Sequence, residues 1–296
     1  MSATAAVPVV GVVGGSGVYD LDGLQGARWE RVASAFGEPS DALLRGEIGG
    51  VEYVFLPRHG RGHRIPPSEI DYRANIDALK RAGVTDLISV SACGSLREEL
   101  APGTFVLVDQ FVDRTFAREK TFFGSGCVAH VSMADPVCAR LRHAVAGVAR
   151  EQGLPIADGG TYLAMEGPQF SSRAESELYR SWGCDVIGMT NMPEAKLARE
   201  AEICYASVAM VTDYDCWHPA EQAVEVADIV ALLTSNAERA RVLVAGVGAA
   251  LETRPVPCPE GCDRALETAL ITPPEARAPA ALERLSAVAG RVLGRA

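Results

Sequence analysis

The sequence is short of basic charge, and this shortage excludes one large class of function. The chain has 296 residues, with 28 Lys and Arg against 38 Asp and Glu, giving a formal net charge of −10. A protein that binds nucleic acid regardless of sequence needs a basic surface to neutralise phosphates. We therefore expect no nucleic-acid partner, and any bound anion must be held by a few local groups.

Membrane, export and metal-binding signatures are also missing. No run of eighteen apolar residues occurs, so we expect no membrane-spanning helix, and the first residues lack the basic stretch of a signal peptide. The eight cysteines form no paired C-x-x-C sets, and only Cys258 and Cys262 are close in sequence. That pair could be a disulfide or a metal clip, but we favour unpaired thiols. We expect a cytoplasmic protein with reduced cysteines, no bound metal and no cofactor.

The nucleotide-binding fingerprints are incomplete. A predicted strand over residues 7–13 runs into Gly14–Gly17, a turn whose amides could surround a phosphate, with the Ser16 hydroxyl as a further donor. A plain tight turn explains this segment equally well. The Rossmann fingerprint fails because Asp20 stands at the third glycine position and later glycines interrupt the helix that should follow. No G-x-x-x-x-G-K-[ST] occurs, so a dinucleotide oxidoreductase is disfavoured.

The residues present indicate one large α/β domain. The chain is 48% hydrophobic, and segments with strand and helix patterns alternate along it. We predict a single domain over residues 1–275, with a mixed, largely parallel central sheet flanked by helices. Prolines break the chain from residue 255 onward, so residues 276–296 are predicted to form a helical or mobile C-terminal tail.

The most informative stretch runs from Cys204 to His218. Its first part, residues 205–211, has the small and β-branched residues of a strand buried on both faces. Asp213 and Asp215 follow and would point to the same side of an extended chain, at the strand end where α/β sheets bind ligands. Two neighbouring carboxylates separate each other's pKa values, so one can hold a proton near neutral pH. A polar turn is the simpler alternative for an isolated D-x-D.

Other predicted strands end in polar or small residues. A strand over residues 51–56 leads to Arg58 and His59, and Arg can bind an oxyanion with two hydrogen bonds. A strand over residues 84–91 leads into a small-residue turn, Ala92–Ser95. Phe170 precedes a predicted helix and could stack on a planar ring or belong to the core. Together these strand ends suggest one convergent site.

Local signals also predict where several helices begin. Ser68–Asp71 and Ser172–Glu175 have the pattern of capping boxes, and Pro193 is expected at the first helical position of another helix. A long amphipathic helix is predicted over residues 221–249.

These motifs jointly resemble the trimeric purine nucleoside phosphorylase family, most closely its 5′-methylthioadenosine phosphorylase branch. The matching segments occur in family order and span nearly the whole chain. They are Gly14–Gly17, Arg58–His63, Ser91–Ser95, Glu166–Glu175, Met189–Thr190 and Thr212–Trp217.

The resemblance implies a phosphate site, a nucleoside site and a homotrimer. It implies phosphate ligands at Ser16, Arg58, His59, Ser91, Ala92 and Thr190. The implied nucleoside contacts are Phe170, Ser171, Met189, Asp213, Tyr214 and Asp215, with Asp213, Asp215 and Ser16 as the catalytic residues. The implied 5′ pocket is lined by Val226, Ile229 and Val230, with Ile271 of a neighbouring subunit as a further candidate, and in the implied trimer His130 reaches into a neighbour's site.

The expected reaction is phosphorolysis of S-methyl-5′-thioadenosine to adenine and the ribose 1-phosphate, in purine and methionine salvage. A protonated Asp213 could supply the N7 proton that the departing base needs. A carboxylate there also accepts from a 6-amino group but faces the lone pairs of a 6-oxo group, which favours adenine. A 5′-halogeno-5′-deoxyadenosine or a 6-oxopurine nucleoside remains the alternative substrate, and a non-catalytic nucleoside-binding protein the alternative class.

Overall fold

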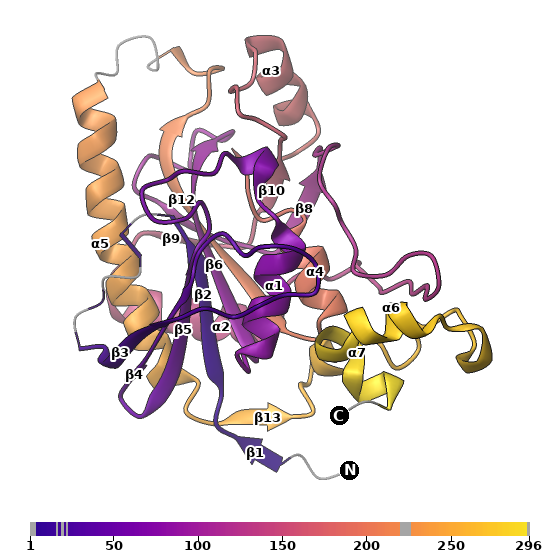
Figure 1. Ribbon diagram of the computed structural model, residues 1–296. Coiled ribbons are helices and arrows are strands. Elements are labelled where there is room, and N and C mark those ends of the chain that lie inside the picture. Colours follow the sequence, from indigo (N-terminus) through magenta and orange to yellow (C-terminus); the bar gives the residue numbers. More distant parts are fainter. Residues whose placement is uncertain (1–3, 16, 19–20, 22, 220–225, 295–296) are drawn as a thin grey trace.

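The computed structural model describes residues 4–15, 17–18, 21, 23–219 and 226–294. Its main feature is a mixed sheet of eleven strands with helices on both faces, which confirms the predicted fold class (Figure 1). The strands are β1 (Thr4–Ala6), β2 (Val9–Gly14), β3 (Gln25–Glu30), β4 (Leu43–Ile48), β5 (Val51–Pro57), β6 (Asp86–Ser95), β7 (Phe105–Val108), β8 (Gln110–Asp113), β9 (Ile156–Asp158), β10 (Thr161–Ala164), β11 (Val186–Gly188), β12 (Cys204–Tyr214) and β13 (Arg254–Val256). The α-helices are α1 (Tyr72–Arg81), α2 (Ala139–Glu151), α3 (Arg173–Ser181), α4 (Glu194–Glu200), α5 (Val226–Ala250), α6 (Pro279–Arg284) and α7 (Ser286–Leu293).

The centre of the sheet is the parallel pair β6 and β12. Strand β2 lies parallel to β6 on its other side, and β5 lies parallel to β2. The carboxyl ends of these four strands therefore meet at one edge, at the top of Figure 1. Strands β1 and β13 form a separate antiparallel pair at the opposite end.

Two hydrophobic clusters cover the two faces of the sheet. One joins α1, α4 and α7 to the sheet, and the other joins α2 and α5. In β12, every residue from Cys204 to Thr212 is buried, because both of its faces are covered by helices. The continuous apolar run in the sequence is thus explained by burial on both sides.

Several predicted boundaries need correction. Residues Pro67–Glu69 form a 3₁₀ turn, so the helix cap is Asp71, whose carboxylate accepts from the Ala74 amide at 2.9 Å, and not Ser68. Pro193 is the N-cap of α4 and not its first residue, and the predicted turn at residues 92–95 is the end of β6. The capping box of Ser172 and Glu175 is confirmed.

The C-terminal segment is helical and packs on the rest of the molecule. Leu285 and Val288 are buried in the same cluster as α1. Arg291 donates to both carboxylate oxygens of Glu202, with its Nη2 2.6 Å from Oε1. These contacts fix α7 against α1, and α6 packs on α7 at the lower right of Figure 1.

Candidate active site

The two acidic residues lie side by side at the carboxyl end of β12. A β-bulge at Thr212 shifts the register, so that Asp213 pairs with Gly94 of β6. A side chain added at Gly94 would lie 3.0 Å from the Asp213 carboxylate and 3.4 Å from the Asp215 Cβ. The absence of a side chain at Gly94 therefore eases the approach of the Asp213 carboxylate, whereas the Asp215 Cβ would be in ordinary contact. The Thr212 hydroxyl donates to Asp213 Oδ2 at 2.6 Å and fixes that carboxylate.

The two carboxylates differ in their surroundings. Asp215 is buried, and its Oδ2 has no hydrogen-bond partner among the described residues. Burial raises the pKa of Asp215, although the Ser176 hydroxyl and the Cys216 amide act in the opposite direction. Asp213 is half-buried. The arrangement thus places a buried carboxyl group with a raised pKa beside a more exposed one.

The turn after Asp215 is anchored on β6. The Asp215 amide donates to the Ser95 carbonyl at 3.0 Å, and the Trp217 indole N–H donates to the same carbonyl at 2.8 Å. The Tyr214 hydroxyl donates to the Glu98 carbonyl at 3.2 Å. These three bonds fix the backbone that carries Asp213 and Asp215, and they leave both carboxylates uninvolved.

Arg58 forms a buried ion pair at the end of β5. Its side chain is 1% exposed, and its Nε lies 2.5 Å from Glu194 Oε1. Nη2 donates to Glu194 Oε2, the Ser89 hydroxyl and the Val13 carbonyl, while Nη1 donates to the Val90 carbonyl at 2.9 Å. Nη1 carries two hydrogens, so this pairing uses one of them. Most of the guanidinium is therefore committed to the protein, which the sequence did not indicate.

His59 follows Arg58 and is held as a neutral ring. Its Nδ1 lies 2.9 Å from the Ile65 carbonyl, so Nδ1 must carry the proton, and the ring stacks on His63 at 4.3 Å. Burial lowers the pKa of His59 to about 4, and the Arg58 charge acts in the same direction. In this tautomer Nε2 is a hydrogen-bond acceptor.

Two hydroxyl groups beside this network are buried without a hydrogen-bond partner of normal geometry among the described residues. They are Ser91 Oγ on β6 and Thr190 Oγ1 after β11. Thr190 does lie near the Tyr162 phenol, whose pKa burial raises to about 12. The next residue, Asn191, has a φ of 69°, and its side-chain Oδ1 accepts a hydrogen bond from the Ser89 hydroxyl at 2.8 Å. This bond fixes the backbone that follows Thr190. Buried hydroxyls are normally satisfied, so these two indicate a polar ligand.

The loop before α3 lies beside the acids. Glu166 is anchored by the buried Arg118 at 3.1 Å, and the Cys216 thiol donates to the Ser171 carbonyl at 3.3 Å. Gly167 allows the loop to pass over Met189, whose Sδ would be 2.5 Å from an added Cβ. Phe170 is 86% exposed on this loop, so it does not belong to the core of the chain.

Some predicted site residues cannot be placed. Ser16 lies outside the described residues, as do the side chains of Val226, Ile229 and Val230 in the first turns of α5. The segments that carry His130 and Ile271 pair with each other through a β-bridge between Ala129 and Leu270. The His130 amide donates to the Ala269 carbonyl and the Ile271 amide donates to the Val128 carbonyl, both at 2.9 Å.

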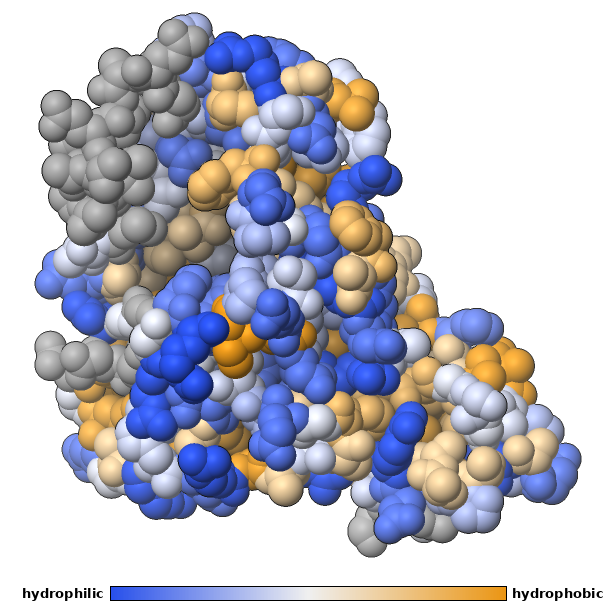
Figure 2. All heavy atoms as spheres, turned by 45° about the horizontal axis from the view of Figure 1, so that its top comes forward, coloured by the Kyte–Doolittle hydropathy of each residue, from blue (hydrophilic) through white to orange (hydrophobic). Residues whose placement is uncertain are grey.

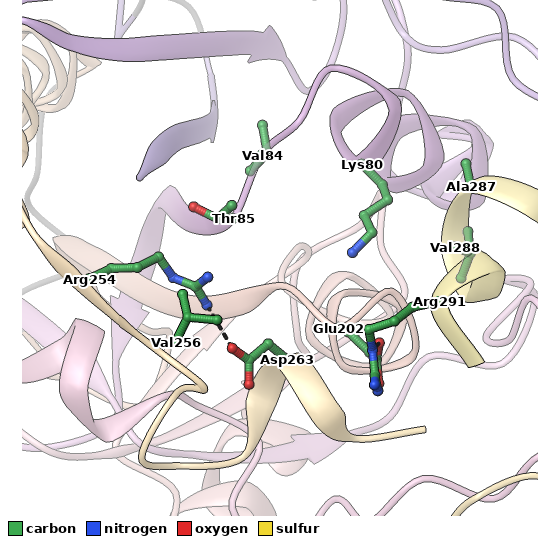
Figure 3. Close-up of a pocket in the computed structure, with 10 residues that line it drawn as sticks. All are labelled: Lys80, Val84, Thr85, Glu202, Arg254, Val256, Asp263, Ala287, Val288 and Arg291. Carbon is green, nitrogen blue, oxygen red and sulfur yellow. Dashed lines mark hydrogen bonds and ion pairs between the residues drawn. The ribbon is translucent and has the colours of Figure 1, made fainter. Parts of the chain in front are cut away.

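The surface is hollowed at the carboxyl edge of the sheet, which Figure 2 turns toward the viewer. A different cavity, of about 240 Å³, lies at the amino edge and is shown in Figure 3. Its lining includes Lys80, Glu202 and Arg254 but none of the predicted site residues. The candidate active site is therefore the carboxyl edge. Sequence reasoning missed Ser89, Asn191 and Glu194 there, because no local pattern connects them to Arg58.

The buried neutral His59 predicts an acid-sensitive contribution to stability. Unfolded histidine titrates near pH 6.5, so the unfolded chain binds more protons than the folded chain between pH 6.5 and 4. The free energy of unfolding should fall as the pH drops through that window, by up to about 3 kcal/mol from this group. Urea unfolding at pH 7 and pH 4.5 should show a smaller loss in His59→Gln than in the wild type. His143→Gln, at an exposed position of α2, is the control; equal losses in all three proteins would contradict the assignment.

Known proteins with a sequence similar to that of this chain are named as phosphorylases. A family model described as the phosphorylase superfamily matches residues 9–247. Proteins from Bradyrhizobium diazoefficiens and Cereibacter sphaeroides, both named S-methyl-5′-thioadenosine phosphorylase, are 66% and 65% identical over 285 residues, covering 96% of this chain and 98% of each relative. The protein of that name from Rhodospirillum rubrum is 63% identical over 294 residues, covering 99% of this chain and 100% of the relative.

Solved structures of methylthioadenosine phosphorylases have the same fold as this chain. A methylthioadenosine phosphorylase from an antarctic soil metagenomic library matches with a TM-score of 0.88 at 46% identity, covering 96% of this chain and 99% of that one. The methylthioadenosine phosphorylase from Schistosoma mansoni in complex with adenine matches with a TM-score of 0.78 at 40% identity, covering 82% and 91%. On the evidence of the matched sequence, the fold and the arrangement at the carboxyl edge, this chain belongs to the phosphorylase superfamily.

Proposed function

We propose that this chain catalyses the phosphorolysis of S-methyl-5′-thioadenosine to adenine and 5-methylthioribose 1-phosphate. The relatives that carry this activity in their names are 63–66% identical over almost the full length. The observation that carries the proposal here is the Ser91 hydroxyl, which is buried without a hydrogen-bond partner in the described part of the chain and lies three residues before the Gly94 that accommodates Asp213. Three residues of strand span about 10 Å, which a nucleoside can bridge between an anion and a base-binding acid.

Phosphate would be bound at one end of this span. The Ser91 and Thr190 hydroxyls would donate to it, and the remaining N–H of Arg58 Nη1 would add a charge-assisted hydrogen bond. The His59 Nε2, an acceptor in the observed tautomer, suits the P–OH of hydrogenphosphate. The Ala92 amide and Ser16 complete the proposed phosphate site. Phosphate needs positioning more than activation, so we expect the reaction to require no cofactor.

The nucleoside would occupy the other end. Asp213 would hydrogen-bond to N7 and the 6-amino group of adenine, with Asp215 and Tyr214 supporting it. Phe170 and Ser171 would cover the purine and Met189 the ribose. In the reaction, a phosphate oxygen bonds to the anomeric carbon, the bond from that carbon to N9 breaks, and the base gains a proton at N7. An acid at Asp213 would supply or share that proton.

We further propose a homotrimer, in which His130 and Ile271 of one subunit complete the 5′ pocket of the next, together with Val226, Ile229 and Val230. Their shared surface supports this, because Ile271 is 59% exposed beside the exposed His130. None of the eight cysteines forms a disulfide, which suits a reducing cytoplasm, and we place the reaction in purine and methionine salvage. Among the described residues, no helix has the length and apolar character to cross a bilayer.

Adenine release in the presence and absence of phosphate tests the proposed reaction. With methylthioadenosine as substrate, adenine should appear only when phosphate is supplied, together with an equimolar sugar 1-phosphate. Equally fast release without phosphate would identify a hydrolase instead. Methylthioinosine, adenosine and a 5′-halogenated analogue, compared at saturating phosphate, would distinguish the alternative substrates. Methylthioadenosine should have the highest kcat/KM of the four.

A further inference from the structure

Four cysteines that are distant in the sequence meet in the interior at the amino edge of the sheet. They are Cys138 at the N-cap of α2, Cys204 at the start of β12, and Cys258 and Cys262 after β13. All four are buried and outside any disulfide, and their sulfur atoms lie within 4.8 Å of one another. We propose that these four cysteines bind one zinc ion as a structural site.

The sulfur atoms lie close enough for one tetrahedral zinc ion, and one of their separations matches it. With Zn–S bonds of about 2.3 Å, neighbouring sulfurs in a tetrahedron are roughly 3.8 Å apart. The Cys138 and Cys258 sulfurs are 3.8 Å apart. Four thiolates in tetrahedral arrangement are the ligand set of closed, structural zinc sites, which leave no position for a substrate.

The turn from Cys258 to Cys262 directs both thiols to one point. Gly261 has a φ of 69°, a conformation that favours glycine, and its amide donates to the Cys258 carbonyl at 2.9 Å. The Cys258 amide donates to both carboxylate oxygens of Asp263, at 3.0 and 2.8 Å. The local backbone therefore holds the pair before any metal binds.

Nearby positive charges suit thiolate ligands. Arg254 Nη2 lies 3.6 Å from the Cys204 sulfur, and Arg199 Nη1 lies 3.7 Å from the Cys262 sulfur. A zinc ion with four thiolates carries two net negative charges, which such donors would stabilise as outer-shell partners. Arg254 is itself held by Asp263 at 3.4 Å, a contact drawn in Figure 3.

The position of the cluster indicates a structural role. Cys204 precedes Asp213 by nine residues of one strand, a separation of about 30 Å. The zinc would thus bind far from the proposed chemistry. It would connect α2, β12 and the segment after β13, which are otherwise joined across the amino edge by hydrogen bonds and side-chain packing.

Zinc content and thiol state test this inference directly. The full chain, expressed with zinc and purified without chelator, should contain about one zinc per chain by elemental analysis. Titration with a mercurial reagent, with a metal-sensitive dye present, should release that zinc as about four thiols react. Cys204→Ala and Cys262→Ala should each abolish stoichiometric zinc, whereas Cys184→Ala, at a buried cysteine outside the cluster, should retain it.

The wild-type protein decides the question even if the cluster variants do not fold. Alkylation under denaturing, non-reducing conditions followed by mass measurement should modify all eight cysteines once zinc is chelated. Modification of only four cysteines would mean two disulfides and would overturn the inference. All eight modified, with less than about a tenth of a zinc per chain before chelation, would mean free thiols and would also overturn it.

Discussion

Replacement of Asp213 by asparagine should lower kcat/KM for methylthioadenosine by roughly 10²–10⁴, the usual contribution of a general acid. An amide cannot supply the N7 proton, and its NH₂ group would face the 6-amino group of adenine. The Thr212 hydroxyl, 2.6 Å from the Asp213 carboxylate, can still hold the asparagine side chain in place. The loss should therefore arise from chemistry and base recognition, and the free energy of unfolding should change little.

The substrate dependence of this loss separates the proposed role from a structural one. Methylthioinosine has a 6-oxo group that an asparagine NH₂ can bind, so its kcat/KM should fall less than that of methylthioadenosine, or should rise. Asp158→Asn provides the control and should keep wild-type activity. Asp158 ends β9, and its carboxylate pairs with Arg142 and Arg150 of α2. Equal losses for both nucleosides in Asp213→Asn would disprove the role of Asp213 in base recognition.

Replacement of Glu194 by alanine should cost about 3–5 kcal/mol of unfolding free energy, because it leaves the buried Arg58 charge unpaired. Arg58 and Glu194 are 1% and 2% exposed, and the carboxylate accepts from both Nε and Nη2. Urea denaturation measures the change. Glu177→Ala removes an exposed partner of Arg180 and should change stability by no more than about 1 kcal/mol.

A double variant distinguishes the lost ion pair from lost packing. Arg58→Met combined with Glu194→Leu removes both charges and keeps apolar volume, so it should be less destabilised than Glu194→Ala alone. The same double variant should have a raised KM for phosphate if Arg58 Nη1 also binds the anion. A double variant at least as unstable as Glu194→Ala would contradict the assignment of the energy to the unpaired charge.

The central strand β12 and the position of the two acids at its carboxyl end could be predicted because their signals are local. Residues 205–211 are apolar on both faces, and the structure buries both faces. The alternation of strand and helix patterns was enough to predict a mixed α/β sheet. Strand β3 was not predicted from the sequence. Five of its six residues are exposed, and apolar and polar residues do not alternate along it.

The missed features depend on contacts between distant residues. Glu194 is 136 residues from Arg58, and nothing near either residue indicates their pairing. The predicted turn at residues 92–95 extends β6 because β11 and β12 pair with it there, which local composition cannot show. The cysteine cluster was missed for the same reason: Cys138 and Cys204 lie far from Cys258 and Cys262 in the sequence.

A crystal structure with adenine and sulfate bound would test the central claim most directly. We expect both in one crevice, with a carboxylate oxygen of Asp213 within hydrogen-bonding distance of N7 and of the 6-amino group. The sulfate should be bound by the Ser91 and Thr190 hydroxyls, which have no partner of normal geometry in the described part of the chain. Adenine and sulfate in separate places, or an Asp213 side chain turned away from the base, would contradict the proposed reaction.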